Sequence, residues 1–362
     1  MRPVRAASPR LRTSSGALRR IRWSAPALTV AVVGSLVLGQ APDGPGTAAE
    51  PGAAVEGAVG SPGGTVTTVA TKRVELKRRT GTVTGDGQTV YVANRTEFRP
   101  RRATVVLPPP VRANAWVVVD LDTGRVLGAN QHRARLPQAS TIKLLTALTA
   151  VRTIKPGARH RVTRFEARQT CSCVGLKPGA YYDRDTLMKG MLLRSGNDAA
   201  EAVAGSHPRG RQAFYRAMNR VARNLGAHDT VAKNASGLTA WGSHSSARDL
   251  VLLLRAAVAN PTVRGMLALT SAEVATVNGR FAKTVWRTTD YVNRTPGSLG
   301  KSGFTTPAQN TLTVVTEVGG RRIAVASLGA PSGYSTDGAR ALTAWAADNF
   351  TGLTGVGRLP QS

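Results

Sequence analysis

A serine followed three residues later by a lysine opens a set of three short polar motifs in this chain. Ser140-Thr141-Ile142-Lys143 comes first, then Ser195-Gly196-Asn197, then Lys301-Ser302-Gly303. Together they supply a nucleophile with a lysine one helical turn away, a second hydroxyl with an amide partner, and a second lysine. Serine becomes an effective nucleophile only when a base removes its proton. The set therefore predicts serine acyl transfer without histidine.

The residues around Ser140 predict that it lies at the start of a helix. Pro137-Gln138-Ala139 precede it, and an apolar helical pattern runs from Thr141 to Val151. The free N–H groups and positive dipole end of a helix N-terminus favour a developing oxyanion. Lys143 lies on the same helical face and can act as a base if burial and nearby positive charge lower its pKa. Taken alone, the motif also fits a helix-capping serine with a surface lysine.

The second motif offers a hydroxyl and an amide. The Ser195 hydroxyl would relay a proton to the leaving group, and the Asn197 amide would bond Lys143 and the substrate backbone. Ser, Gly and Asn equally suit a turn that caps the following helix, so this motif alone is a weak signal.

The third motif precedes the closing strands of the chain. An edge strand at this place would hold an extended substrate by backbone pairing, and Gly303 would allow close approach. Lys301 would direct positive charge toward a substrate carboxylate and toward Lys143. The alternative is the polar end of a hairpin. The occurrence of all three motifs in this order is what favours the chemical interpretation.

The apolar pattern predicts which elements position these motifs. Strands are expected at residues 115–120, 125–129, 311–316 and 323–328, and helices at 141–151, 185–204, 247–258 and 337–349. The stretch 185–204 is expected to be interrupted at the Ser195 motif. Turns at Asp122-Thr123-Gly124 and Gly319-Gly320 join the strands into two hairpins on either side of a helical middle. This order predicts an α/β chain of the α+β type, in which the first strands of an antiparallel sheet pair with the last and helices flank the sheet.

The chain is long enough for one large domain with additional segments. We expect a signal peptide or N-terminal signal anchor in residues 1–40, a Gly/Pro/Ala linker in 41–66, a basic, partly β or disordered segment in 67–112, the main domain in 113–350 and a C-terminal tail in 351–362. Within the basic segment, Gln88–Val92 alternates like a strand after a Gly85-Asp86-Gly87 turn.

The N-terminus has the features of an export signal. The first 22 residues contain seven arginines and no acid, and Ala25–Gly39 is an uncharged apolar run of 15 residues. A stable membrane span needs about 20 residues, and small residues at Gly39-Gln40-Ala41 and Thr47-Ala48-Ala49 offer cleavage sites. We therefore expect an exported, extracytoplasmic protein, either secreted or anchored by this hydrophobic segment.

The formal net charge is +29, and 40 of the 49 basic residues are arginine. Residues 1–112 carry 17 Lys/Arg against 6 Asp/Glu, and residues 113–362 carry 32 against 14, so the excess is spread over the whole chain. Such a surface attracts polyanions. The low aromatic content argues against nucleic acid, and we expect residues 67–112 to hold the protein near an anionic cell-wall polymer or a membrane surface.

The two cysteines, Cys171 and Cys173, lie one residue apart. In an exported protein two thiols suggest a disulfide, but Cys-x-Cys closes a very small ring. No His or Cys partners lie at metal-ligand spacing. A local loop pin and a pair of free thiols both remain open.

Longer stretches around the motifs resemble one family. They are residues 139–148, 195–200, 234–238, 244–250, 295–297 and 301–305. Over residues 113–350 the chain is similar to the low-molecular-mass penicillin-binding proteins, the serine-type D-alanyl-D-alanine carboxypeptidases. The resemblance implies a β-lactamase/transpeptidase-like fold with a helical subdomain, no cofactor and no metal. It also implies peptidoglycan stem peptides as substrates and β-lactam antibiotics as covalent inhibitors.

The resemblance also assigns roles to individual residues. It places catalysis on Ser140, Lys143, Ser195 and Asn197, and substrate binding on Lys301, Ser302, Gly303, Phe304 and Thr305. Ser140 would carry the acyl group, and the backbone N–H groups of Ser140 and Phe304 would form the oxyanion hole. The chain departs from the family pattern in having Ser302 where Thr is commoner and Gln309 where Gly is usual. Arg340 is the nearest arginine to a position where the family often carries one.

These departures leave several activities open. A DD-carboxypeptidase is the leading prediction and a DD-endopeptidase is a close variant. A β-lactamase would need a glutamate in a Glu-x-x-Leu-Asn loop, and the candidates Glu201 and Glu273 lack that context. A non-catalytic wall-binding protein is the alternative from another class, which the intact motifs oppose.

Overall fold

The structure is a computed structural model that describes residues 81–85, 88–92, 108–349 and 357–360. The expected signal segment, residues 1–40, and the linker, residues 41–66, lie outside the described residues. Within the basic segment, β1 (Gly81–Gly85) pairs antiparallel with β2 (Gln88–Val92). The strand expected at Gln88–Val92 is therefore confirmed, with its partner directly before the turn.

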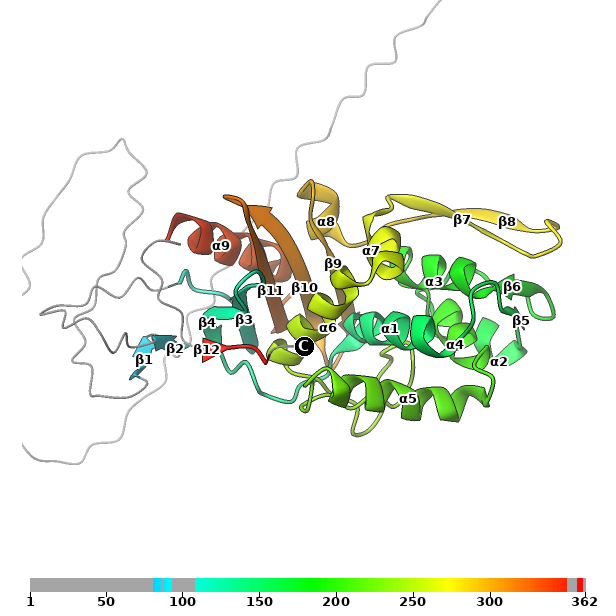
Figure 1. The fold of residues 1–362 in the computed structure, drawn as a ribbon, viewed down its shortest axis with the longest axis horizontal. Helices are drawn as coiled ribbons and strands as arrows, with labels where there is room; N and C mark the ends of the chain where they lie inside the picture. Colours follow the sequence, from blue (N-terminus) through cyan, green and yellow to red (C-terminus); the bar gives the residue numbers. More distant parts are fainter. Residues whose placement is uncertain (1–80, 86–87, 93–107, 350–356, 361–362) are drawn as a thin grey trace, which may run out of the picture. The chain divides into compact units, whose positions relative to one another are not determined.

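A six-stranded antiparallel sheet forms the framework of the domain (Figure 1). Its spatial order is β12 (Gly357–Arg358), β4 (Arg125–Asn130), β3 (Ala115–Asp120), β11 (Arg321–Ala330), β10 (Gln309–Val318) and β9 (Leu299–Thr305). Strand β3 pairs with β11, so the first strands of the sheet join its last ones as the sequence predicts. Strand β12 adds part of the expected C-terminal tail to the sheet.

Strand β3 is buried on both faces, which explains its continuous apolar sequence. Trp116 and Val118 point into a core that also contains Leu342 and Ala346 of α9 (Tyr334–Asp348). Val117 and Val119 point into the opposite core, which is shared with α1 (Lys143–Thr153) and α6 (Ala247–Ala259). The sheet is thus covered by α9 on one face and by α1 and α6 on the other.

The middle of the chain forms a mainly helical half, which we define as residues 143–248. Besides α1 it contains α2 (Arg164–Ala167), α3 (Arg184–Leu193), α4 (Asn197–Gly205), α5 (Gly210–Asn224) and a short hairpin of β5 (Arg159–Arg161) and β6 (Tyr181–Asp183). The break expected around Ser195 separates α3 from α4. Helix α5 was not predicted, although its buried apolar residues recur at helical spacing, as Ala213, Phe214, Ala217, Met218, Val221 and Ala222.

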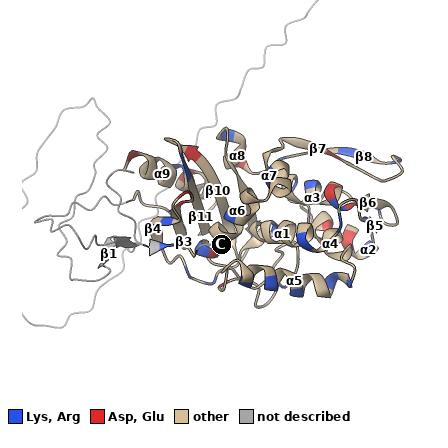
Figure 2. Cartoon of the chain, in the orientation of Figure 1, with Lys and Arg blue, Asp and Glu red and all other residues tan. Residues whose placement is uncertain are grey.

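The remaining elements return the chain to the sheet. They are α7 (Pro261–Ala268), the hairpin of β7 (Ser271–Ala275) and β8 (Ala282–Trp286), and α8 (Asp290–Arg294). No single described helix is long and apolar enough to cross a membrane; α6 and α7, bent by 97° at their junction, pass that test only as a pair. Lys and Arg occur in both halves of the domain (Figure 2), as their spread along the sequence predicts.

Candidate active site

Ser140 lies in a tight 3₁₀ turn, Ala139–Ile142, that continues directly into α1. The predicted place at a helix start is therefore confirmed. The preceding residue, Ala139, has a left-handed φ of 46°, which is unusual for a residue with a side chain. Gly237 packs so closely under Ala139 that a Cβ on Gly237 would overlap the Ala139 carbonyl. The loop around Gly237 and the strained backbone before Ser140 thus position the serine together.

Lys143 is fully buried beneath Ser140 and makes three contacts of 2.7 Å through Nζ. The partners are the Ser140 hydroxyl, Asn197 Oδ1 and the backbone carbonyl of Ser236. The last two can only accept hydrogen bonds, so a neutral amine donates its two protons to them. Its lone pair then faces the Ser140 hydroxyl, which is the geometry a general base requires.

The electrostatic surroundings favour that neutral state. Burial, and after it the positive charge of Lys301, hold the pKa of Lys143 well below its usual value; Glu201 and Asp198 oppose this shift. Each charged lysine disfavours the charge on the other. The sequence-based expectation that burial and a nearby cation would prepare Lys143 as a base agrees with this arrangement.

Asn197, the first residue of α4, is held in one orientation. Its Oδ1 accepts from Lys143, and its Nδ2 donates to the Thr170 carbonyl at 2.6 Å. Its backbone N–H donates to the Ser172 carbonyl at 2.7 Å. Asn197 therefore connects the lysine to the loop of residues 170–176, which forms one wall of the site.

Ser195 and Lys301 meet across the site. Lys301 Nζ donates to Ser195 Oγ at 3.0 Å and to the Ser302 carbonyl at 2.7 Å. Burial lowers the pKa of Lys301 to about 7. Ser195 has a left-handed φ of 59°, so its hydroxyl is presented from a strained turn between α3 and α4. Lys301 was expected to direct positive charge toward a substrate carboxylate. Because its Nζ is buried and faces Ser195, it would act on such a carboxylate from within the protein.

Strand β9 is the edge of the described sheet on this side, as the third motif predicts. Gly303 lies against the nucleophile: a Cβ there would be 2.5 Å from the backbone nitrogen of Ser140. The neighbouring Phe304 is 60% exposed, and Ser302 and Thr305 also face the open side. An edge strand offers unpaired backbone groups to an extended peptide.

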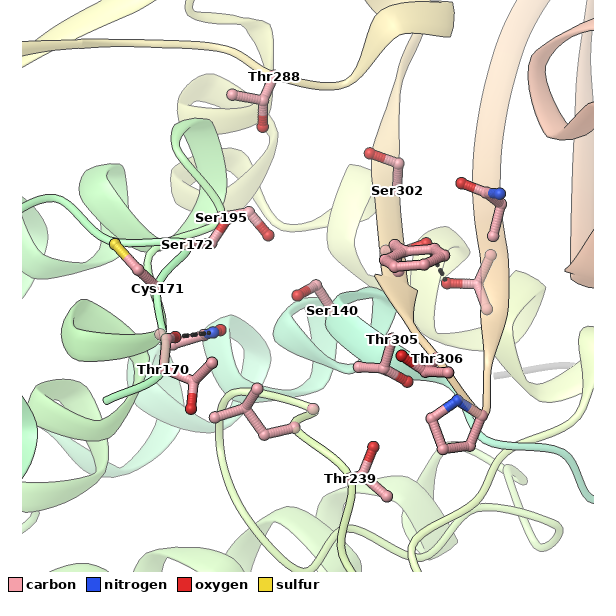
Figure 3. Close-up of a pocket in the computed structure, with 18 of the residues that line it drawn as sticks. Ser140, Thr170, Cys171, Ser172, Ser195, Thr239, Thr288, Ser302, Thr305 and Thr306 are labelled. Carbon is pink, nitrogen blue, oxygen red and sulfur yellow. Dashed lines mark hydrogen bonds between the residues drawn. The ribbon is translucent and has the colours of Figure 1, made fainter. Parts of the chain in front are cut away.

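These residues surround an open cleft of about 750 Å³. Figure 3 shows Ser140 at its centre, with Ser195 and the loop of residues 170–172 on one side and Ser302 and Thr305 of β9 on the other. Eleven of the lining residues carry hydroxyl groups. Among the described residues, none that lines the cleft is charged, so both lysines act from beneath its floor.

The same arrangement of sequence and fold occurs in known proteins. Residues 102–332 match the peptidase S11 family, described as D-alanyl-D-alanine carboxypeptidase. The chain belongs to this family. A D-alanyl-D-alanine carboxypeptidase of Mycobacterium tuberculosis is 38% identical over 224 residues, which cover 61% of this chain and 76% of the relative. The family match identifies the protein as a peptidase. The predicted β-lactamase/transpeptidase-like fold is confirmed by the similarity to solved DD-peptidases.

Two further comparisons bear on fold and activity. The crystal structure of a D-alanyl-D-alanine carboxypeptidase from M. tuberculosis H37Rv superimposes with a TM-score of 0.65 at 34% identity, covering 73% of this chain and all of that chain. A D-alanyl-D-alanine endopeptidase of Escherichia coli is 29% identical over 240 residues, covering 64% of this chain and 76% of the relative. The chain is therefore similar both to proteins named carboxypeptidase and to a protein named endopeptidase.

A disulfide joins Cys171 to Cys173 in the wall of the carboxypeptidase-family cleft. Of the two alternatives left open by the sequence, the structure has the local loop pin. The loop is also held by Asp198, whose carboxylate accepts from the backbone N–H groups of residues 174, 175 and 176 at 2.8 to 3.2 Å. Asn197 of the second motif and the adjacent Asp198 therefore hold this wall together, and Asn197 also binds Lys143.

Sequence reasoning missed one contributor to this carboxypeptidase-family site and left two positions in doubt. The carbonyl of Ser236, a ligand of Lys143, was quoted only as part of a family-like stretch and was given no role. Gln309, the first residue of β10, has a left-handed φ of 52°, a conformation that glycine adopts without strain. Arg340 does not line the cleft, whereas Ser335 does.

The two glutamates considered for β-lactamase chemistry do not line the cleft either. Glu201 is buried on α4, where Oε1 accepts from the backbone N–H of Ala235 at 3.0 Å and Oε2 from the Tyr215 hydroxyl at 2.5 Å. Glu273 lies on β7. Glu201 therefore supports the loop that carries Ser236, and neither residue is placed to activate water at Ser140.

Proposed function

We propose that this protein is an exported serine DD-carboxypeptidase that removes the terminal D-alanine from peptidoglycan stem peptides through an acyl-enzyme on Ser140. The observation that carries the proposal is the environment of Lys143. Asn197 Oδ1 and the Ser236 carbonyl can only accept hydrogen bonds, so they take both protons of the neutral Lys143 amine. The third contact of the amine is the hydroxyl of Ser140. Membership of the carboxypeptidase family supports the substrate class.

The first half of the reaction forms the acyl-enzyme. Ser140 Oγ attacks the carbonyl carbon of the penultimate D-alanine as Lys143 takes the hydroxyl proton. The backbone N–H groups of Ser140 and Phe304 stabilise the oxyanion, a role supported by the close approach of Gly303 to the Ser140 nitrogen. The C–N bond then breaks as Ser195 passes its hydroxyl proton to the departing amine of D-alanine. Ser195 takes up in its place the proton that Lys143 removed from Ser140, so the Lys143 amine is neutral again before water enters.

Water completes the turnover. It attacks the ester on Ser140 and loses its proton to the Lys143 amine, which returns that proton to Ser140 Oγ as the acid leaves. The rim of hydroxyl groups from Ser302 and Thr305 would bind the substrate carboxylate, with Lys301 beneath supplying positive potential. A β-lactam would follow the acylation step alone and remain as an ester on Ser140.

A DD-endopeptidase is the second candidate. The cleft is open and, among the described residues, has no cation in its lining to demand a free terminal carboxylate. A relative named as an endopeptidase lends it support. We place either activity outside the cytoplasm and expect residues 67–112 to favour an anionic wall polymer or membrane surface through their charge.

Release of free D-alanine is the test of the proposed function. The full chain is expected to release D-alanine from a stem-peptide mimic ending in D-Ala-D-Ala and to cut a cross-linked peptide dimer at least about tenfold more slowly, a barrier difference of about 1.4 kcal/mol. Amino-acid analysis and chromatography measure the two products. Faster cleavage of the dimer would replace the carboxypeptidase by the endopeptidase, and no turnover of either would contradict both.

Gly303→Ala is expected to slow acylation by penicillin about tenfold or more. The new Cβ would collide with the Ser140 backbone nitrogen and push β9 away from the nucleophile. Stopped-flow labelling measures the rate. Gly265→Ala is the matched control, because a Cβ on Gly265 of α7 meets nothing within 4 Å. A folded Gly303→Ala variant with the wild-type rate would show that β9 need not lie against Ser140.

A further inference from the structure

The helical half of the domain has a one-sided surface charge. Residues 143–248 contain 18 Lys/Arg and 6 Asp/Glu. Of the basic side chains 13 are exposed, namely Arg152, Lys155, Arg159, Arg161, Arg164, Arg168, Lys177, Arg194, Arg209, Arg216, Arg220, Arg223 and Lys233. All six acids of this half are buried or half-buried. The charge of this half is therefore a property of its surface.

Helix α5 concentrates this charge into one line. Its apolar residues are buried, while Arg216, Arg220 and Arg223 recur on the exposed face at intervals of four and three residues. Arg209, directly before the helix, continues the row. At about 1.5 Å per residue the four arginines extend over roughly 21 Å. In Figure 2 blue segments, which are all arginine in this helix, recur along α5. We call Arg209, Arg216, Arg220 and Arg223 the α5 arginine row.

The α5 arginine row is available to a ligand. None of its side chains forms an ion pair or side-chain hydrogen bond within the described residues. Arg211, on the neighbouring face, is different: it binds the buried carboxylate of Glu166 and lies over the Phe165 ring at 4.5 Å. That contact joins the start of α5 to the exposed arginines of α2 and β5, so the basic surface continues beyond the helix.

Two arginines of the row act on one buried group. The pKa of His207 is lowered, first by burial and then by the charges of Arg209 and Arg220. The charges of Arg209 and Arg220 thus both act at His207, near the start of α5. Such a row has no catalytic use, because none of its members lines the cleft.

We propose that the α5 arginine row binds a linear phosphodiester polyanion, of the kind a cell-wall polymer would present. Arginine recognises phosphate by paired N–H donors, and a row of cations matches a chain of repeated charges. The exposed face of α5 has no large apolar or aromatic side chain. It therefore has no side chain that could insert into a bilayer or stack on a base. Binding there leaves the cleft open and keeps the enzyme beside wall-attached substrate.

The experiment uses full-length protein and end-labelled poly(glycerol phosphate), followed by fluorescence anisotropy over a range of salt. Arg216→Gln, Arg220→Gln and Arg223→Gln are combined in one variant. Its matched control combines Arg264→Gln, Arg280→Gln and Lys283→Gln, which remove the same charge from exposed residues outside the helical half. The N-terminal basic segment is identical in all three proteins, so it contributes equally.

The α5 variant is expected to bind the polymer about tenfold more weakly at low salt, with a shallower salt dependence, because three phosphate contacts are lost. The control should lose less than about twofold through its net charge. Equal losses in the two variants would overturn the proposal. So would binding of wild-type protein to anionic phospholipid vesicles in preference to the polymer. Penicillin labelling, measured in parallel, reports on the proposed catalysis independently.

Discussion

Replacing Ser140 by alanine is expected to abolish covalent labelling by a fluorescent penicillin. The labelled wild-type protein should yield one modified peptide that contains Ser140, as measured by gel fluorescence and peptide mass spectrometry. The reason is geometric: of the hydroxyls in the cleft, Ser140 is the one bonded to Lys143, at 2.7 Å. Without that oxygen no ester forms. The other cleft hydroxyl that contacts a lysine, Ser195, accepts a hydrogen bond from Lys301 at 3.0 Å and therefore does not give its own proton to it.

Ser172→Ala is the control for this experiment. Ser172 also lines the cleft and is exposed, but its hydroxyl has no basic partner among the described residues. That variant should be labelled as fully as the wild type. Undiminished labelling of a folded Ser140→Ala protein would remove Ser140 from the role of nucleophile, whatever the family membership implies.

The sheet and its main helices could be predicted because their signals are local. β3 has a continuous apolar run and a turn after it, and α6 has a long apolar stripe that begins after a capping serine, Ser246. The pairing of β3 with β11 also followed, since hairpins on either side of a helical middle must share one sheet. Helix α5 was missed although its buried apolar pairs recur at helical spacing, so a local signal for it was present in the sequence as well.

The site was predictable to the extent that side chains define it. Ser140, Lys143 and Asn197 have the types and spacing that acyl transfer needs, and the structure brings them together. The contribution of Ser236 could not be predicted, because it consists of a backbone carbonyl that every residue possesses. The burial of Lys301 could not be predicted for a related reason. The direction of the Lys301 side chain depends on how β9 packs against the turn before α4.

The polar wall of the cleft illustrates a third limit. The sequence places Cys171 and Cys173 in a loop, yet their bond and position in the wall depend on Asn197 and Asp198 binding the loop backbone. Side-chain to backbone contacts over such separations leave no periodic signal. The chemistry of a motif can thus be inferred from its residues, whereas its partners on the main chain require the fold.

Lys143→Ala is expected to reduce the acylation rate by at least about a thousandfold, within the range attributed to general base catalysis. Among the described residues of the site, no His or carboxylate lines the cleft to replace the amine. Penicillin labelling rates measure the effect. Lys143→Met fills more of the vacated space and serves as the control for packing; it should be equally inactive. Acylation within about tenfold of wild type would identify another base.

The pH dependence distinguishes a base from a structural lysine. Because burial and Lys301 lower the pKa of Lys143, the neutral amine is populated at lower pH than for a free lysine. The wild-type acylation rate should therefore fall as pH drops through that lowered pKa, and the residual rate of Lys143→Ala should lack this acidic limb. The same shift affects stability. Between the lowered pKa of Lys143 in the folded protein and its ordinary pKa in the unfolded chain, the unfolded state binds the extra proton. The free energy of unfolding therefore decreases as the pH falls through this range. Lys143→Met removes this cost and should melt at neutral pH no lower than wild type. A rate profile unchanged by the substitution would show that Lys143 holds the fold and does not carry the proton.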